Sequence, residues 1–333
     1  MKKVLSLILA LAMVFALVAC GEKQPSNDGN TDGDKSARGN VIMTFGTADT
    51  GGSMYPAGAA VSQVWTNNVE GVKCNTQTST GSFQNCQDVS TGEVDVAVAT
   101  SDVVLNAYNG TGKFADIGKL DNLRVIGAVY TSVLSGVALK SSGLTYIHDL
   151  LGKRVAVGPA ASATENATLA AFGVMGIDSS NTSLENLGLG DGADSVGDGI
   201  LDAAFGFAGL PIGGQLNLAA TKEIQVLDMT QEEIDKVLAG NAAYIQTKIP
   251  AGTYTGQDND ANTFGVKCLI IVTADMDADL VYDLCKAMNE HTEEMAAGNA
   301  LLKDMTDPSF LCTQMPIPLH DGAQKYYSEQ GLI

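Results

Sequence analysis

The 333-residue sequence has few basic residues, with 19 Lys and Arg against 38 Asp and Glu and a formal net charge of −19. Nucleic acids and anionic lipid surfaces attract proteins of the opposite charge. This excess of acidic residues therefore argues against nucleic acid and against anionic lipid as partners. Net charge carries no information about the fold.

Patterns typical of catalysis and metal binding are also lacking. The three histidines, His148, His291 and His320, do not have metal-ligand spacing. No Gly-x-Ser-x-Gly elbow occurs. Residues 110–114 read Gly-Thr-Gly-Lys-Phe, and Phe114 stands where a phosphate loop needs Ser or Thr to hold magnesium. We therefore expect a protein that is not an enzyme, with no cofactor and no metal site.

Cysteine is scarce, and its number does not suit a disulfide framework. Besides Cys20 there are five, an odd number without zinc-ligand spacing: Cys74, Cys86, Cys268, Cys285 and Cys312. Cys74 is expected in a strand and Cys86 in the helix that follows, which leaves a disulfide between them open. Buried free thiols that act as small apolar residues are the favoured interpretation.

Residues 4–18 are apolar and carry no charge, and they follow Lys2 and Lys3. This order predicts a secretory signal peptide over residues 1–19, too short to span a bilayer comfortably. Leu-Val-Ala directly before Cys20 predicts a lipoprotein signal in which Cys20 is lipidated. An ordinary signal peptide with a coincidental cysteine is the alternative.

Residues 20–40 contain hardly any apolar side chain and predict a disordered tether after the lipidated cysteine. Such a chain reaches about 25 Å. We expect a protein outside the cytoplasm, anchored by lipid alone to the outer face of the cell membrane, as in a Gram-positive cell.

From residue 41 onward, short apolar runs alternate with helical patterns, which predicts an α/β class with mostly parallel sheets. Residues 96–99 form an apolar run typical of a fully buried strand. Residues 124–128 and 135–139 predict two further strands. With 45% hydrophobic residues, the chain is large enough for two ordinary domains.

Small residues join a strand to a helix at three places. In the first, the strand over 41–45 ends and a helix begins near Ser53, which we expect to be its N-cap. The second contains Ser82 as the expected cap, and the third lies at 158–165. Each helix start offers unpaired backbone N–H groups and the positive end of the helix dipole, which together attract anions.

Ser101 and Asp102 begin another helix after the buried strand at 96–99. Asp102 either caps that helix or faces a ligand, and the cap is the favoured interpretation. Lys153 and Arg154 precede the strand at 155–157 and therefore lie at its amino end. A ligand bound beyond its carboxyl end would be roughly 10 Å or more away, at 3.3 Å per residue.

Several motifs, taken together and in order, resemble the TAXI-type solute receptors that serve TRAP (tripartite ATP-independent) transporters. Thr50-Gly51-Gly52-Ser53-Met54-Tyr55-Pro56 is similar to the Thr-Gly-Gly-Thr-x-Tyr-Pro segment of that family. The other matching motifs are Gly81-Ser82-x-x-Asn85, Ser101-Asp102-Val103, Gly158-Pro159 with Ser162-x-Thr164-Glu165, Ile249-Pro250-Ala251-Gly252-Thr253-Tyr254 and Ile317-Pro318-Leu319-His320. The resemblance covers about residues 41–331.

The resemblance implies a type II periplasmic-binding-protein fold, with two α/β lobes joined by a strand hinge. Lobe 1 is expected over residues 41–136 plus 252–333, and lobe 2 over 137–251. Family members bind small carboxylates, often acidic amino acids such as glutamate, and pass them to a sodium-driven TRAP permease. We expect a monomer. The alternatives are a sensor that presents its ligand to a membrane kinase or chemoreceptor, and a small-molecule enzyme on the same fold.

The ligand would lie beyond the carboxyl ends of the strands, where helix starts converge. The predicted ligand-binding residues are Thr50, Gly51, Gly52, Ser53, Tyr55, Thr80, Gly81, Ser82, Asn85, Ser101, Asp102, Pro159, Ser162, Thr164, Glu165, Gly209 and Tyr254. Backbone N–H groups and hydroxyls, rather than an arginine, would hold the carboxylate.

Overall fold

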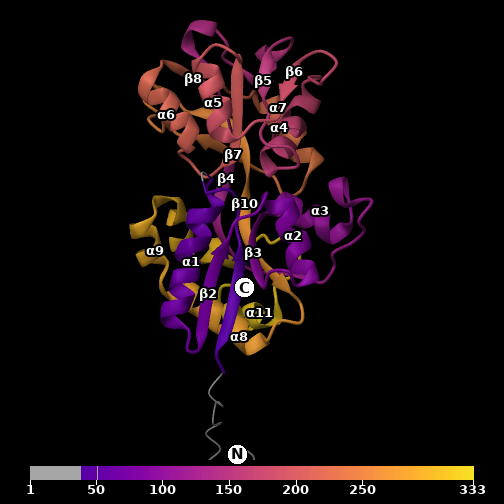
Figure 1. The fold of residues 1–333 in the computed structure, drawn as a ribbon, viewed down its shortest axis with the longest axis vertical. Helices are drawn as coiled ribbons and strands as arrows, with labels where there is room; N and C mark the ends of the chain where they lie inside the picture. The colour runs from indigo at the N-terminus through magenta and orange to yellow at the C-terminus, as the bar shows by residue number, and fades with distance from the viewer. Residues whose placement is uncertain (1–38, 51) are drawn as a thin grey trace, which may run out of the picture. The chain divides into compact units, whose positions relative to one another are not determined.

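The computed structural model describes residues 39–50 and 52–333, so the signal peptide, Cys20, most of the tether and Gly51 lie outside the described residues. The described part is an α/β fold in which helices flank a ten-stranded sheet with the order β2-β1-β3-β10-β4-β7-β5-β6 (Figure 1). Strand β8 pairs with β4, and β9 pairs with β10. No helix within these residues is both long enough and apolar enough to cross a membrane.

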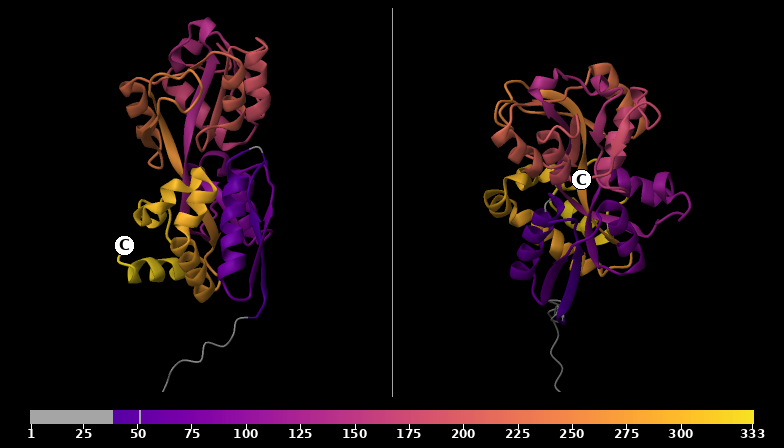
Figure 2. Two further views of the ribbon diagram at one scale, coloured as in Figure 1. Left: turned by 90° about the vertical axis from the view of Figure 1, so that its left-hand side faces the viewer. Right: turned by 45° about the horizontal axis from the view of Figure 1, so that its top comes forward.

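One end of the sheet, with its helices, forms what we call lobe 1. Its parallel strands are β1 (Val41–Gly46), β2 (Val72–Gln77) and β3 (Val96–Thr100). The helices that follow these strands are α1 (Met54–Asn68), α2 (Ser82–Thr91) and α3 (Ser101–Asn109), with the short 3-10 helix η1 (Gly112–Phe114). The C-terminal segment, yellow in Figure 2, adds α8 (Ala278–Glu290), α9 (Thr292–Gly298), η4 (Ala300–Thr306), α10 (Pro308–Cys312) and α11 (Asp321–Glu329).

The other end of the sheet forms lobe 2. Its strands are β5 (Arg154–Ala156), β6 (Ser183–Glu185), β7 (Ala203–Ala208), β8 (Ile224–Val226) and β9 (Ile245–Ile249). Its helices are α4 (Ala163–Val174), α5 (Leu189–Gly197), α6 (Gly213–Thr221) and α7 (Gln231–Gly240), with η2 (Lys140–Ser142) and η3 (Ile147–Leu150).

Two long strands, β4 (Leu123–Leu139) and β10 (Ala261–Thr273), run through both lobes. Residues 123–133 of β4 pair with β10, and residues 133–138 pair with β7 of lobe 2. Residues 268–271 of β10 pair with β3 of lobe 1, whereas 261–265 pair with β9 of lobe 2. All these pairings are antiparallel, so the expectation of mostly parallel sheets holds only among β1, β2 and β3 and among β5, β6 and β7.

Strand β4 also corrects the prediction of two separate strands at 124–128 and 135–139, because the intervening residues continue the same strand. Gly136 lets this strand pass close to β7. A methyl group added at its α-carbon would lie 2.6 Å from Cε1 of Phe205. Gly136 is therefore a point of close packing inside a continuous strand.

The apolar residues bury both faces of the sheet, as expected where helices cover both sides. In β3, Val96 and Val98 belong to one core cluster, while Ala97 and Ala99 belong to the other. Successive side chains of a strand point to opposite faces, which explains this division. The prediction that residues 96–99 form a fully buried strand is confirmed.

The packing of residues 254–266 differs from the predicted lobe boundary. That boundary placed residues 252–333 with lobe 1. Tyr254 and Ala261 pack in one apolar cluster of lobe 2, and Phe264 and Val266 pack in another. The order of segments in the sequence did not reveal this boundary. The first residues of β10 pair with β9 of lobe 2, and only its later residues pair with β3 of lobe 1.

The five cysteines of the described residues are free and buried, which confirms the interpretation as apolar thiols. Burial raises the pKa of the Cys74 thiol to about 11 and that of Cys268 to about 12. His320 is buried as the N-cap of α11, where its Nδ1 accepts the Gly322 N–H at 3.2 Å. Burial lowers the pKa of His320, which favours the neutral ring at this cap.

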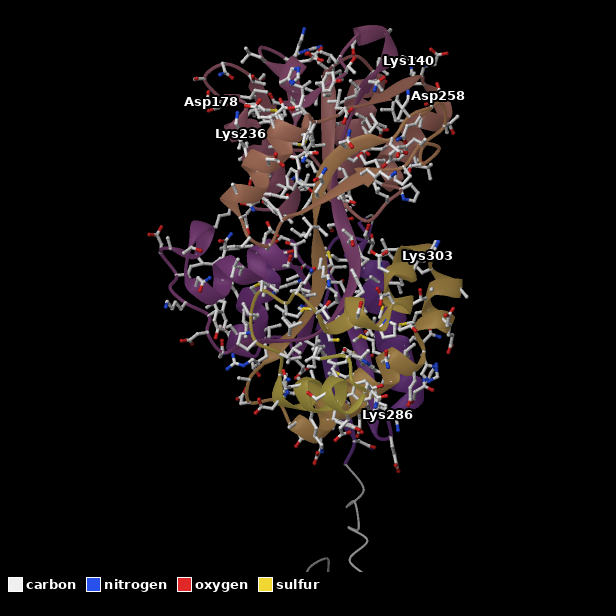
Figure 3. The ribbon with its side chains drawn as sticks, turned by 180° about the vertical axis from the view of Figure 1, so that it is seen from behind. Lys140, Asp178, Lys236, Asp258, Lys286 and Lys303 are labelled. Carbon is white, nitrogen blue, oxygen red and sulfur yellow. The ribbon has the colours of Figure 1, made fainter. Side chains whose placement is uncertain are left out.

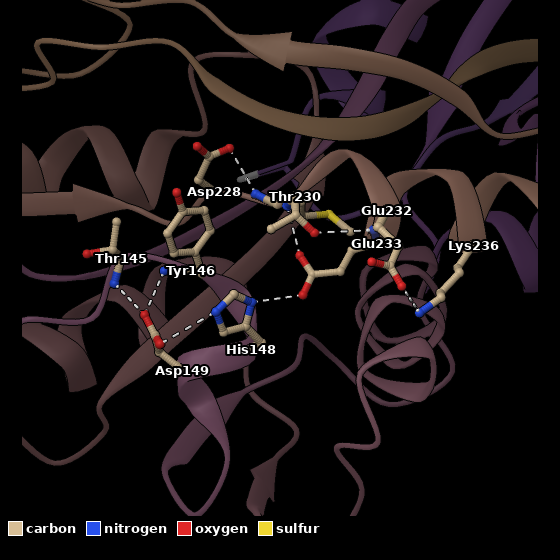
Figure 4. A network of polar contacts seen from close by, with 10 residues as sticks. Thr145, Tyr146, His148, Asp149, Asp228, Thr230, Glu232, Glu233 and Lys236 are labelled. Carbon is tan, nitrogen blue, oxygen red and sulfur yellow. Dashed lines mark hydrogen bonds and ion pairs between the residues drawn. The ribbon is translucent and has the colours of Figure 1, made fainter.

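His148 belongs to a polar network on lobe 2 and to no metal cluster (Figure 4). Its Nδ1 lies 2.8 Å from Oε1 of Glu233, and its ring stacks on Tyr146. Glu233 also completes a capping box with Thr230 at the start of α7. Across the described residues, no group of three or more His, Cys, Asp or Glu side chains is placed to hold a metal ion.

The packing of Gly136 gives a direct test of the fold. We expect Gly136→Ala to lower the free energy of unfolding by about 1–3 kcal/mol, because the added methyl overpacks Phe205. Gly173→Ala is the matched control, since nothing lies within 4 Å of a methyl at this exposed position in α4. It should raise stability by about 0.5–1 kcal/mol. Urea unfolding followed by circular dichroism measures both, and equal effects would contradict the assignment.

Candidate binding site between the lobes

The first helix start joins the two lobes through Ser53. Ser53 is the N-cap of α1, as predicted, but its side chain forms no capping hydrogen bond. Its Oγ instead accepts the backbone N–H of Gly209, which follows β7, at 3.1 Å. Gly209 is itself tightly packed, because a methyl group there would lie 1.8 Å from Cδ1 of Leu301 in lobe 1. Thr50 is exposed, and Gly52 and Tyr55 are half-buried.

The polar side chains at the second helix start form hydrogen bonds within lobe 1. The prediction that Ser82 caps α2 is wrong, because Ser82 is the first helical residue and Gly81, at φ +110°, is the N-cap. Only glycine adopts such a backbone readily. Ser82 Oγ accepts the Thr100 N–H at 3.0 Å. Asn85 is buried, and its amide donates to the carbonyl oxygens of Thr47 and Val98.

Thr80 lies on the outer side of the same junction. It is exposed, and its hydroxyl donates to Oε1 of Gln84 at 3.0 Å. Of the predicted residues at this junction, the side chains of Ser82 and Asn85 therefore hold β1, α2 and β3 together, and Thr80 faces solvent.

Asp102 lies where the lobes meet. The prediction that it caps α3 is wrong, because the N-cap is Thr100. Its carboxylate is fully buried, and Oδ2 accepts Nδ2 of Asn166 at 2.9 Å and the Tyr244 hydroxyl at 3.4 Å, both from lobe 2. Oδ1 has no hydrogen-bond partner among the described residues.

Burial raises the pKa of Asp102, and the hydrogen bond from Asn166 offsets only part of that effect. No cationic side chain of the described residues forms an ion pair with it. Asp102 therefore combines a buried carboxyl, a free acceptor atom and contacts from the opposite lobe. Ser101 next to it is buried as well.

At the third helix start the structure supplies a cap that the sequence analysis did not name. Ser162 is the N-cap of α4, and its Oγ accepts the Glu165 N–H at 3.1 Å. Thr164 is buried, and its Oγ1 accepts the Phe207 N–H at 3.2 Å, so its hydroxyl ties α4 to β7. Pro159 is exposed. The side chain of Ser162 is half-buried, which leaves it the more accessible of the two hydroxyls.

Glu165 forms an ion pair across the lobes. Its Oε2 lies 2.7 Å from Nζ of Lys113 in η1 and also accepts the Ala161 N–H. Burial opposes the charged form, but Lys113, Ala161 and Asn186 outweigh it and lower the pKa of Glu165. Because Lys113 is 41% exposed, the pair contributes no more than about 1 kcal/mol.

The last predicted residue, Tyr254, lies in the core of lobe 2. Its hydroxyl donates to Oε1 of Gln215 at 2.8 Å and accepts the Ile212 N–H at 3.1 Å. Gln215 also accepts the hydroxyl of Ser135 in β4. Tyr254 thus joins the start of α6 to the strand that crosses between the lobes.

Arg154 lies at the start of β5 and pairs with Asp202, with Nη2 2.8 Å from Oδ1. This hydrogen bond raises the pKa of Arg154. As predicted, Arg154 lies at the amino end of the strand, where its guanidinium is paired with Asp202. Sequence reasoning missed Lys113, Asn166, Tyr244 and Leu301 as contacts between the lobes. Only Lys113 stood in a segment that had been singled out, and no motif marked the others.

Between the lobes near Ser162 there is a cavity of about 20 Å³, lined in part by Phe83, Val103, Lys113 and Asn166. This volume is close to the minimum that holds one water molecule. In this arrangement the described residues therefore leave little space beside Ser162.

Two α/β lobes joined by β4 and β10, with the starts of α1 and α4 at their junction, define a type II periplasmic-binding-protein fold. A model of the NMT1-like family matches residues 45–331. The chain therefore belongs to the NMT1-like family.

Solved structures similar to this chain are distant in sequence. The alkanesulfonate-binding protein SsuA from Xanthomonas axonopodis pv. citri, bound to MOPS, has 14% identity and a TM-score of 0.49, over 88% of this chain and 85% of that one. The substrate-binding protein of an amino acid ABC transporter has 14% identity and a TM-score of 0.45, over 80% and 98%. A putative L-cystine ABC transporter from Listeria monocytogenes has 16% identity and a TM-score of 0.45, over 81% and 95%.

The pKa of Asp102 gives a prediction with a defined sign. A carboxyl whose pKa is raised by folding contributes less to stability as pH rises from its unfolded pKa, about 3.9, through its folded pKa. We therefore expect Asp102→Asn to gain stability relative to the wild type as pH increases from 4 to 8. Asp116→Asn, at an exposed position, is the control and should show no such trend. Urea unfolding across this pH range measures the difference, and a flat or declining curve for Asp102→Asn would refute the assignment.

Proposed function

We propose that this protein is an extracytoplasmic solute-binding protein that captures a small carboxylate between its lobes and delivers it to a TRAP-type permease. The observation that carries the proposal is the set of direct bonds between lobes at two predicted helix starts, Ser53 to Gly209 and Glu165 to Lys113. Residues far apart in the chain meet there at the starts of α1 and α4. The NMT1-like family membership is compatible with this role.

The chemistry of the junction favours recognition without an arginine. Arg154 is paired with Asp202. The starts of α1 and α4 supply backbone N–H groups and a favourable dipole for a carboxylate. Ser53 and Ser162 supply hydroxyls. Ser82, Asn85, Thr164 and Tyr254 keep these elements in place through buried hydrogen bonds.

The proposal includes a hinge at the two crossing strands. Because residues 254–266 pack with lobe 2, we place the points at which the strands pass from one lobe to the other near Val133 in β4 and near Lys267 in β10. It also includes a lipid anchor at Cys20, a monomeric state and a sodium-driven permease, as the resemblance to TAXI receptors implies. An acidic amino acid such as glutamate is the first ligand to test.

A sensor that presents its ligand to a membrane kinase or chemoreceptor would use the same lobes. The two roles differ in the partner and not in the solute site. A gene for a many-helix permease beside this one favours transport. Turnover of a bound ligand would instead support the alternative of a small-molecule enzyme on the same fold. The described residues contain no group of side chains placed to hold a metal ion.

Mass spectrometry of small molecules released from the purified protein identifies the solute directly. We expect a small organic acid that carries one or a few carboxylate groups. X-ray scattering with that compound should then show a smaller radius of gyration than the solute-free protein, because the lobes must close to exclude water from the ligand. Identical scattering profiles at saturating and zero ligand would rule out a hinge.

Point variants test how the carboxylate is recognised. Ser53→Ala removes the hydroxyl that joins α1 to Gly209, and Ser162→Ala removes the cap of α4. Each should weaken binding by about 0.5–1.5 kcal/mol, or two- to tenfold. Arg154→Gln is the control and should change affinity by less than twofold. Calorimetry with the identified solute measures all three, and loss of binding in Arg154→Gln alone would refute the helix-start mechanism.

A further inference from the structure

Behind the junction lies a second and larger cavity, of about 480 Å³. It is lined by elements of both lobes: Ser101 and Leu105 of α3, the 242–245 segment that leads into β9, Lys267 of β10 and residues 314–316. Its volume falls in the range of small-molecule sites. Of the residues predicted to bind the solute, only Ser101 lines it.

Lys267 gives this cavity its chemistry. Its side chain is only 9% exposed, and it is the one charged residue that lines the cavity. Nζ donates to the carbonyl oxygens of Phe310 and Thr313, both at 3.0 Å, and lies 4.6 Å from the centre of the Phe310 ring. An ammonium has three N–H donors, so these two bonds leave one.

The nearby carboxylates do not neutralise Lys267 by a direct ion pair. Asp304 accepts the hydroxyl of Thr131 at 2.8 Å, and Asp307 caps α10 through the Ser309 N–H. Neither lines the cavity. Burial lowers the pKa of Lys267, and a bound anion would offset that cost of burying its charge.

Two further polar groups and three apolar side chains complete the lining. The hydroxyl of Ser101 forms no hydrogen bond with another described residue, and Gln314 presents an exposed amide at a backbone φ of +54°. The apolar part is made by Leu105, Ile245 and Met315, of which Ile245 is 36% exposed. A polar end and an apolar wall fit a ligand with one charged head and a short hydrocarbon chain.

We propose that this cavity, lined by Lys267, Ser101 and Gln314, is a second binding site for a small monocarboxylate with an apolar chain. The carboxylate lies against the Lys267 ammonium, and the chain lies against Leu105, Ile245 and Met315. Because residues 242–245 belong to lobe 2 and the other lining segments to lobe 1 or the crossing strand, the ligand contacts both lobes at once. This site shares only Ser101 with the residues predicted to bind the solute, and the proposal does not depend on the solute site.

Sodium hexanoate is the probe, and the methyl signal of Met315 reports where it binds. In the full-length protein labelled with ¹³C-methyl methionine, hexanoate should shift the Met315 signal saturably, while the buried Met43 and Met305 signals in another core cluster stay unchanged. Met315→Leu assigns the signal. Saturation with no shift at Met315, or equal shifts at all methionines, would overturn the proposal.

Variants separate binding from a structural role of Lys267. Lys267→Met should weaken hexanoate binding about tenfold or more, since a hydrogen bond to a charged group is lost. Lys303→Met, at an exposed lysine of the same lobe (Figure 3), should leave binding unchanged. Ala243→Trp fills the cavity without touching the Lys267 bonds and should abolish binding at unchanged stability. Unaltered affinity in Ala243→Trp would overturn the proposal even if Lys267→Met failed to fold.

Discussion

The pairing of β4 with β10 is the constraint on which the rest of the structure depends. These two strands are the connection through which the sheet passes from one lobe to the other, and they are hydrogen-bonded to each other where they cross. Each strand then takes a different partner in each lobe. Bending at this point requires no break in either hydrophobic core, because the core clusters lie on either side of it.

With the cores separate, the contacts that hold the lobes together are few and mostly polar. One is a hydroxyl bonded to a backbone amide, one is an exposed ion pair, and one is the buried carboxyl of Asp102. Exposed pairs and single hydrogen bonds each contribute about 1 kcal/mol. If the lobes hinge as proposed above, contacts of this size would let a ligand that forms several hydrogen bonds shift the equilibrium between an open and a closed arrangement.

The sequence predicted the α/β class and the three helix starts because these depend on local patterns. Strand-forming runs, glycines and a capping serine are each visible within ten residues, and Ser53 is the N-cap of α1 as expected. The direction of a side chain at a helix start was not predictable in the same way. Ser53, Ser82 and Asp102 all form hydrogen bonds with residues that are distant in the chain. Which residue lies within hydrogen-bond distance of each side chain depends on the folded arrangement.

Long-range pairing explains the other failures too. Residues 124–128 and 135–139 look like two strands because glycine and serine lie near the gap, yet β4 is continuous. Residues 254–266 follow the hinge region in sequence but pack with lobe 2. Tyr244 and Asn166 contact Asp102 across the lobes, and neither lies in a motif that suggests it.

The five buried thiols have a consequence for the extracytoplasmic role proposed above. Thiolate is the form that reacts with oxidants and disulfides, and burial keeps these groups protonated. The native fold therefore prevents these thiols from forming disulfides, and disulfides form only in molecules whose core has opened. Labelling of Cys86 or Cys285 by a thiol reagent therefore reports on opening of the surrounding core, and its rate equals the opening rate when the reagent reacts faster than the core recloses.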